Sequence, residues 1–195
     1  MNPLNKWFLG KTNVPLVLGL IALAALLIVT FNQVFTPAFR AVTAGHDIID
    51  LQIPITPEMI YAQLPDYTAA SARLYTWFIV ADFIFPAAAA LAVAFFWAWL
   101  FKAAPNPLYS ALLRVPIFAL PLLTGFFDWM ENVGFLTIVY CYPVELPLVA
   151  SISCAIRSAK LFVMSINGSL STVFIAITLG FWLYGRFFRS QETRT

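Results

Sequence analysis

The chain has little charge for its length. Charged residues make up 10% of the 195 residues and hydrophobic residues 62%, whereas soluble domains contain about 25% charged and roughly 45–50% apolar residues. A water-soluble fold of this size would still expose about a third of its surface, so it could not hide so much apolar surface. A lipid bilayer removes that limit. The composition therefore indicates an integral membrane protein.

The sequence also lacks motifs that would identify a catalytic activity. The two cysteines and one histidine form none of the patterns CxxC, HExxH or HxxxH, so we expect no metal site and no cofactor. The glycine-rich nucleotide loops and the GxSxG motif of serine hydrolases are absent too. The net charge of +2 is small and its basic residues are dispersed, which argues against a nucleic-acid partner.

Long apolar segments are what the sequence does have. Four segments, at about 14–35, 74–101, 112–140 and 159–184, are long enough for helices across the ~30 Å bilayer core, which takes roughly 20 residues. The first could instead be a secretory signal peptide, but its apolar run is longer than a signal core. We therefore predict an all-α, polytopic membrane protein, a four-transmembrane-helix bundle that forms one membrane domain over residues 1–195.

The distribution of lysine and arginine predicts the orientation, because cytoplasmic loops are enriched in these residues. An N-in/C-in arrangement places seven basic residues inside and three outside, with an outer loop at 36–73. The bacterial inner (plasma) membrane fits this topology best, and the endoplasmic reticulum is the alternative. The inner group is Lys6, Lys11, Lys102, Arg114, Arg186, Arg189 and Arg194, and the outer group is Arg40, Arg73 and Arg157.

The outer loop contains one helix signal. Thr56, Pro57 and Glu58 read as an N-cap, a proline at the first helical position and an acid in the first turn. We predict a short helix over 57–64 between the first two spans, with Asp66 as the cap of the next span. His46 of this loop is interpreted as a solvated side chain, because a metal site needs more ligands than its surroundings provide.

The costly polar residues of the spans gather at one depth. Asp82 lies about eight residues, or roughly 12 Å, from the outer end of its predicted helix, and Glu131 and Asn167 lie at similar depths in theirs. Ionisable residues within a membrane segment usually face the protein interior and are by default candidates for a functional site. The inner half of the spans has little that compares. The sequence therefore predicts a polar pocket in the outer half of the bundle.

The spacing of these residues supports a single pocket. Asp128, Glu131 and Asn132 are at i, i+3 and i+4 and so share one helix face. Three carboxylates accompany one lysine, so one carboxyl group holds a proton or a cation binds there. Arg73 and Arg157 could lean in from the rim. The candidates for acid–base catalysis are Asp128, Glu131 and Asp82, and those for ligand binding are Asn132, Lys160, Asn167 and Arg73.

Three functions remain open at this stage. The pocket could bind or act on a membrane lipid or another lipid-like, amphipathic small molecule, since its predicted walls are Phe, Leu and Ala. It could belong to a proton- or cation-coupled transporter, or the chain could be a structural or assembly subunit of a membrane complex. A purely structural polar network is also an interpretation, because buried polar groups can tie helices together.

Two further features have alternative interpretations. Cys141 and Cys154 flank the predicted third loop and could form a disulfide or stay as two free thiols. Ala90, Ala94 and Ala98 are spaced four apart, which permits close helix approach either within the bundle or in a homodimer through this Ala-rich face.

The predicted architecture broadly resembles the emopamil-binding and sigma-2 receptor class. Members of that class also pack about four helices around intramembrane carboxylates, with a larger loop between the first two helices. The resemblance covers topology and the acids of the second and third spans, here Asp82, Asp128 and Glu131. It implies sterol-like or amphipathic ligands and assigns a role to no individual residue.

Overall fold

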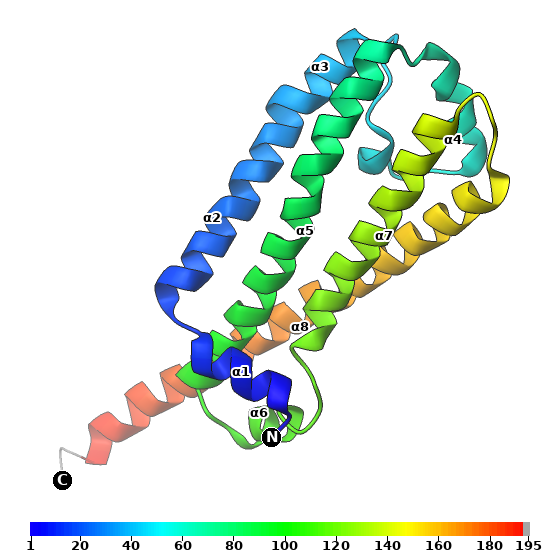
Figure 1. Ribbon diagram of the computed structural model, residues 1–195. Coiled ribbons are helices and arrows are strands. Elements are labelled where there is room, and N and C mark those ends of the chain that lie inside the picture. Colours follow the sequence, from blue (N-terminus) through cyan, green and yellow to red (C-terminus); the bar gives the residue numbers. More distant parts are fainter. Residues whose placement is uncertain (193–195) are drawn as a thin grey trace.

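The computed structural model describes residues 1–192, which form helices joined by turns and short loops (Figure 1). Three helical segments are long and apolar enough to cross a membrane, namely Val14–Ala41, Ala69–Ala103 and Pro147–Tyr184. The chain thus has the helices of a multi-pass membrane protein. Arg194 lies outside the described residues, and the side chains of Arg186 and Arg189 are likewise not described.

The first apolar segment is one long rod built from three pieces. After the short helix α1 (Pro3–Lys11), α2 (Val14–Thr30) continues through a π-helical turn, η1 (Phe31–Phe35), into α3 (Thr36–Ala41). Asn13 caps α2 by accepting a hydrogen bond from the backbone of Leu16 at 2.9 Å. The π-helical turn inserts one extra residue into the helix, which changes the face that later residues present.

The connection between the first two spans folds back onto the end of the bundle. It contains η2 (Ile49–Leu51), α4 (Pro57–Gln63) and η3 (Leu64–Asp66). Thr56 caps α4 through the backbone N–H of Met59, as predicted. We call this the loop end of the bundle, and the opposite end, which carries α1, the N-terminal end (Figure 1). Buried side chains fix this connection in place; they are Ile48, Ile49, Ile60 and Leu64.

The second span, α5 (Ala69–Ala103), begins with a cap other than the predicted one. Thr68 and Ser71 form a reciprocal capping box, in which each side chain accepts a hydrogen bond from the other residue's backbone N–H. Asp66 instead lies 2.7 Å from the ring of His46. The prediction that Asp66 caps this helix was therefore wrong, because a better-placed hydroxyl follows it two residues later.

The last two long helices differ most from their predicted bounds. After α6 (Pro107–Leu112), the turns around Pro116 delay the start of α7 (Ala119–Cys141), so Asp128 and Glu131 fall near its middle. The final helix, α8 (Pro147–Glu192), starts about twelve residues earlier than predicted and includes Arg157 and Cys154. The loop between α7 and α8 is correspondingly short, and Arg157 lies inside a helix rather than at a rim.

Close helix crossings hold α7 in the middle of the bundle. At Gly125 an added Cβ atom would lie 3.1 Å from the carbonyl oxygen of Pro86 on α5, and at Gly134 it would lie 1.9 Å from Oγ of Ser153 on α8. A larger residue at either crossing would therefore force a neighbouring group to shift. Along the bundle α2 packs on α5, α5 on α7 and α7 on α8, while α8 tilts away from α2 towards the loop end (Figure 1).

Aromatic side chains fill the N-terminal end. Phe101 stacks on Tyr109 with ring centroids 3.9 Å apart, and Phe174 meets both rings edge to face. The hydroxyl of Tyr109 donates to the backbone oxygen of Phe174 at 2.8 Å. Ala94 and Ala98, two residues of the Ala-rich face, are fully buried in this core within a single chain.

Candidate functional site

Glu131 is the centre of a buried polar cluster at the loop end. Its side chain is fully buried and forms ion pairs with Arg157 and Lys160, both from α8. Oε2 of Glu131 lies 2.5 Å from Nζ of Lys160, and Oε1 accepts from the guanidinium group of Arg157. Two basic side chains at positions i and i+3 of α8 thus converge on one carboxylate of α7.

The other predicted polar residues join this cluster through direct contacts. Lys160 also donates to Oδ1 of Asp128 at 3.1 Å. Asn132, next to Glu131 on α7, donates to Oδ2 of Asp82 on α5 at 2.8 Å. Asp82, Asp128, Glu131, Asn132 and Lys160 therefore lie together, in three helices, as the spacing suggested.

Asp50 also belongs to the cluster, although the sequence places this residue in the outer loop. It is buried in η2, and its Oδ2 accepts a hydrogen bond from Tyr75 of α5 at 2.5 Å. Arg157 donates to the backbone oxygen of Asp50 at 2.7 Å and to that of Gln52 at 2.6 Å. The only local signal is that Asp50 stands between Ile49 and Leu51, which does not show that it joins the cluster.

The charges of the cluster do not cancel. Four carboxylates, those of Asp50, Asp82, Asp128 and Glu131, face the two basic groups of Arg157 and Lys160, so full ionisation gives a net charge of −2. Burial raises the pKa of Asp50 well above 3.8, and the nearby carboxylates of Asp82 and Glu131 raise it further. The cluster thus favours a bound proton or a cationic group.

A cavity of about 240 Å³ opens beside this cluster, and we call it the acidic cavity. One wall comes from α2 and η1, including Ile28 and Phe31, and the opposite wall from α8, including Leu161 and Met164. Its polar lining consists of Asn32, Asp50, Asp82, Asp128, Arg157 and Lys160. The acidic cavity therefore combines apolar side walls with a charged floor.

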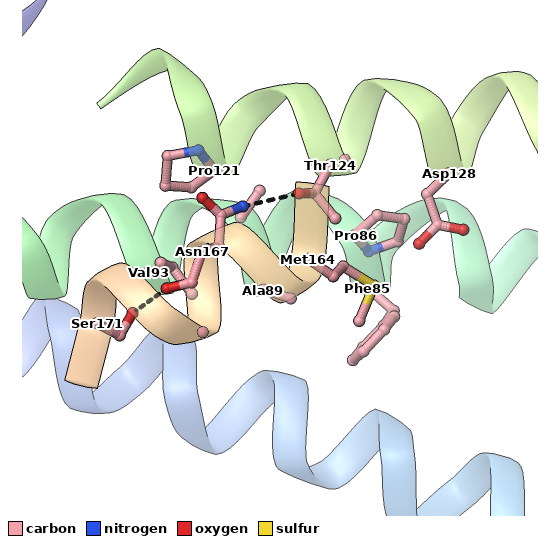
Figure 2. Close-up of a pocket in the computed structure, with 13 residues that line it drawn as sticks. Phe85, Pro86, Ala89, Val93, Pro121, Thr124, Asp128, Met164, Asn167 and Ser171 are labelled. Atoms are coloured by element: carbon pink, nitrogen blue, oxygen red, sulfur yellow. Dashed lines mark hydrogen bonds between the residues drawn. The ribbon is translucent and has the colours of Figure 1, made fainter. Parts of the chain in front are cut away.

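A second cavity of about 270 Å³ lies next to the first and towards the N-terminal end; we call it the apolar cavity. Figure 2 shows Asp128, Phe85 and Met164 at one of its ends and Asn167 and Ser171 towards the other. Asn167, a predicted ligand-binding residue, donates to Oγ1 of Thr124 at 2.9 Å. It thus lies in the apolar cavity, outside the polar cluster.

The remaining predicted site residues lie apart from the cluster. Arg73 is exposed at the loop end and lines neither cavity, while Arg157 is the arginine that contacts the acids. Cys141 and Cys154 are both free thiols, the second of the two alternatives. His46 contacts Asp66 and is partly exposed.

Comparisons with protein-family models, with curated proteins and with solved structures found no match to this chain. The resemblance to the emopamil-binding and sigma-2 receptor class therefore stays a likeness of predicted architecture. The geometry of the polar cluster and its cavities is therefore the basis for inferring a function.

Proposed function

We propose that the protein is a four-span membrane protein that binds an amphipathic, lipid-like small molecule in the acidic cavity. The observation that carries the proposal is the composition of that cavity, which joins apolar walls to a buried cluster with an excess of carboxylates. Ligand pockets are typically apolar with a few convergent polar groups. An amphiphile with a cationic head would match both parts.

The fourth span of this proposal is α7. Its 23 residues correspond to about 34 Å of helix, enough for the ~30 Å apolar core. Asp128, Glu131 and Asn132 lower its hydropathy relative to the other three helices, but these side chains are buried rather than exposed to lipid. A polar helix shielded on both sides by α5 and α8 is compatible with a membrane interior.

The position of the acidic cavity favours entry from the side of the bundle. Ile28 and Asn32 on one wall and Leu161 and Met164 on the other belong to α2, η1 and α8, whose outer faces are apolar. A ligand dissolved in the bilayer could therefore reach the cavity between these helices without crossing water. Asp82 and Asp128 would then face its head.

Each member of the cluster has a role in this proposal. Glu131 holds Arg157 and Lys160 in place, so it acts as a positioning residue. Asp82 and Asp128 line the acidic cavity and offer carboxylate oxygens to the ligand. If a reaction follows binding, Asp128 is the best-placed general acid or base, because it both lines the cavity and contacts Lys160.

Transport is less favoured, because a transporter needs a polar route through the whole bundle. Towards the N-terminal end the interior consists of packed aromatic and alanine side chains, among them Trp97, Phe101 and Phe174. Proton or cation flux through the protein in liposomes would nevertheless support the transporter alternative over simple binding.

The proposal is tested by titrating the reconstituted protein with dodecyltrimethylammonium and with uncharged dodecanol. The protein is placed in phosphatidylcholine nanodiscs and binding is followed by calorimetry. We expect the cation to bind more tightly than the alcohol, and Asp128→Asn or Asp82→Asn to weaken binding of the cation at least roughly tenfold, since opposite charges about 4 Å apart attract each other by about 4 kcal/mol near a protein surface.

Glu58→Gln is the matched control, because Glu58 is an exposed acid of α4 that lines neither cavity. This variant should bind the cation like the wild type. Equal binding of cation and alcohol, or unchanged binding by the Asp128→Asn and Asp82→Asn variants, would assign the cluster a purely structural role.

A further inference from the structure

The apolar cavity has no role in the binding of a charged head, and it lies directly beside the acidic cavity. We propose that it receives the hydrocarbon chain of the amphiphile whose head occupies the acidic cavity, so that the two cavities form one elongated site. This inference rests on the proposed function and adds the chain as a second recognised part of the ligand.

The two cavities share part of their walls. Phe85, Asp128 and Met164 line both of them. In Figure 2 these three side chains lie towards one end of the apolar cavity. A chain that begins at Asp128 and passes Met164 would therefore run along α8 towards Ser171.

The lining of the apolar cavity suits a saturated chain. The polar side chains that line it form hydrogen bonds within the protein. Asn167 donates to Thr124, and Ser171 donates to the backbone oxygen of Asn167 at 2.7 Å. The indole N–H of Trp97 in turn donates to Ser171 at 2.8 Å. The remaining oxygen of the Asn167 side chain is buried and has no hydrogen-bond partner among the described residues. The cavity thus offers dispersion contacts and no exposed hydrogen-bond donor.

Small residues create the space for the chain. Ala89 on α5 and Gly168 on α8 both line the cavity. An added Cβ at Gly168 would meet no atom within 4 Å, in contrast to Gly125, where it would lie 3.1 Å from Pro86. Glycine at 168 therefore leaves open space, whereas glycine at 125 permits a helix contact.

The volumes agree with a site made of both cavities. At about 240 Å³ and about 270 Å³, each is smaller than the roughly 300–1,000 Å³ that small-molecule sites usually occupy, and together they fall within that range. An amphiphile with its head at Asp128 and its chain beside Gly168 would use both.

The experiment compares alkyltrimethylammonium ions with octyl, decyl, dodecyl and tetradecyl chains, titrated into the protein in phosphatidylcholine nanodiscs. Gly168→Leu fills the apolar cavity from α8, and Ala89→Leu fills it from α5. Gly19→Leu is the matched control, because Gly19 is exposed like Gly168 and also has nothing within 4 Å of an added Cβ, but Gly19 lies on α2 and lines neither cavity.

We expect the two filling variants to bind the octyl ion like the wild type and the tetradecyl ion at least about tenfold more weakly, since the added leucine side chain occupies the space that the longer chain needs. Gly19→Leu should bind both ions like the wild type. Circular dichroism of each variant checks the fold, and the two filling positions on different helices make the test independent of one misfolded variant.

Three outcomes would overturn the inference. If both filling variants bind every chain length like the wild type, or lose all lengths equally, the apolar cavity does not hold the chain, while the proposed head site stands. If the wild type binds no member of the series in a manner that depends on Asp128, the proposed function fails as well.

Discussion

The two ends of the bundle reach a buried interior by different means. At the N-terminal end, rings such as Phe101, Tyr109 and Phe174 fill the space, and the Tyr109 hydroxyl has partners on α8. At the loop end, the centre is occupied by Glu131, Arg157 and their charged neighbours. Both ends have apolar side chains around these centres.

The two ends differ in how many buried polar atoms lack a hydrogen-bond partner among the described residues, and the loop end has more of them. A carboxylate oxygen of Asp50 and the amide oxygen of Asn132 are buried at the loop end without a hydrogen-bond partner among the described residues. Unpaired buried polar groups cost roughly 1–3 kcal/mol each, so a network kept only for stability should not leave them. This difference supports the proposal that the loop end holds the binding site.

The largest expected effect comes from removing the centre of the loop end. Glu131→Ala leaves Arg157 without its carboxylate and Lys160 with only Asp128. Breaking a buried ion pair on one side typically costs about 3–5 kcal/mol. The free energy of unfolding, measured by titrating the micelle-bound protein with dodecyl sulfate, should fall by that amount.

The exposed Glu58→Ala substitution controls for the loss of a carboxylate, and we expect it to change stability by less than about 0.5 kcal/mol. A loss below about 1 kcal/mol for Glu131→Ala would show that the loop end does not depend on its charges. The contrast between the two ends would then disappear.

A smaller effect is expected from separating α7 and α8 at the loop end. Gly134→Ala would place a Cβ atom 1.9 Å from Oγ and 3.1 Å from Cβ of Ser153, so the Ser153 hydroxyl must rotate away and the two helices must adjust. Such overpacking usually costs about 1–3 kcal/mol. Gly19→Ala, which meets no atom within 4 Å, should not destabilise the protein.

Adding Ser153→Ala to Gly134→Ala should recover part of the loss, because it removes the Oγ atom that the new Cβ approaches. Unfolding titrations of the single and double variants measure this coupling. If Gly134→Ala is as stable as the wild type, the close crossing at this end is not needed.

The third effect, the smallest per unit of the variable changed, is a pH dependence that only the loop end should show. Because the pKa of Asp50 is raised above 3.8 in the folded protein, the folded state holds this proton more tightly than the unfolded state. The resulting stability is fully present below pH 3.8 and is lost as the pH rises through the raised pKa, by at most about 1.4 kcal/mol per pH unit.

Asp50→Asn should remove this part of the pH dependence while keeping an acceptor for Tyr75. Tyr109→Phe, at the N-terminal end, should lower stability by about 0.5–1.5 kcal/mol at every pH in this window, because it loses a neutral hydrogen bond. Unfolding curves recorded across this pH range compare the three proteins. An unchanged pH profile in Asp50→Asn would contradict the assignment.

Much of the fold follows from the sequence, because apolar length and capping residues are local signals. The span at Ala69–Ala103 and the short helix after Thr56 were predicted close to their observed bounds. The start of α8 was missed, because Arg157 and Lys160 look like a helix boundary when their partner Glu131 is unknown. Only the ion pairs with Glu131 make these two charged side chains compatible with a continuous membrane helix.

The site was predicted in part for the same reason. Residues spaced on one helix face, such as Asp128, Glu131 and Asn132, could be grouped from the sequence. Asp50 could not be grouped with them, because its place depends on how the loop folds over the bundle. The choice between Arg73 and Arg157 also depended on the true start of α8.

The π-helical turn at Phe31–Phe35 sets the rotation of everything that follows it in the first span. In an unbroken α-helix Phe31 and Phe39 would point about 80° apart, but with one residue taken up by the wide turn they differ by about 20°. Both rings can therefore enter the same core, where both are buried. A chain of the same length that formed an unbroken α-helix here would be an equally good membrane helix, yet it would turn Phe39 about 80° away from Phe31 and out of this core.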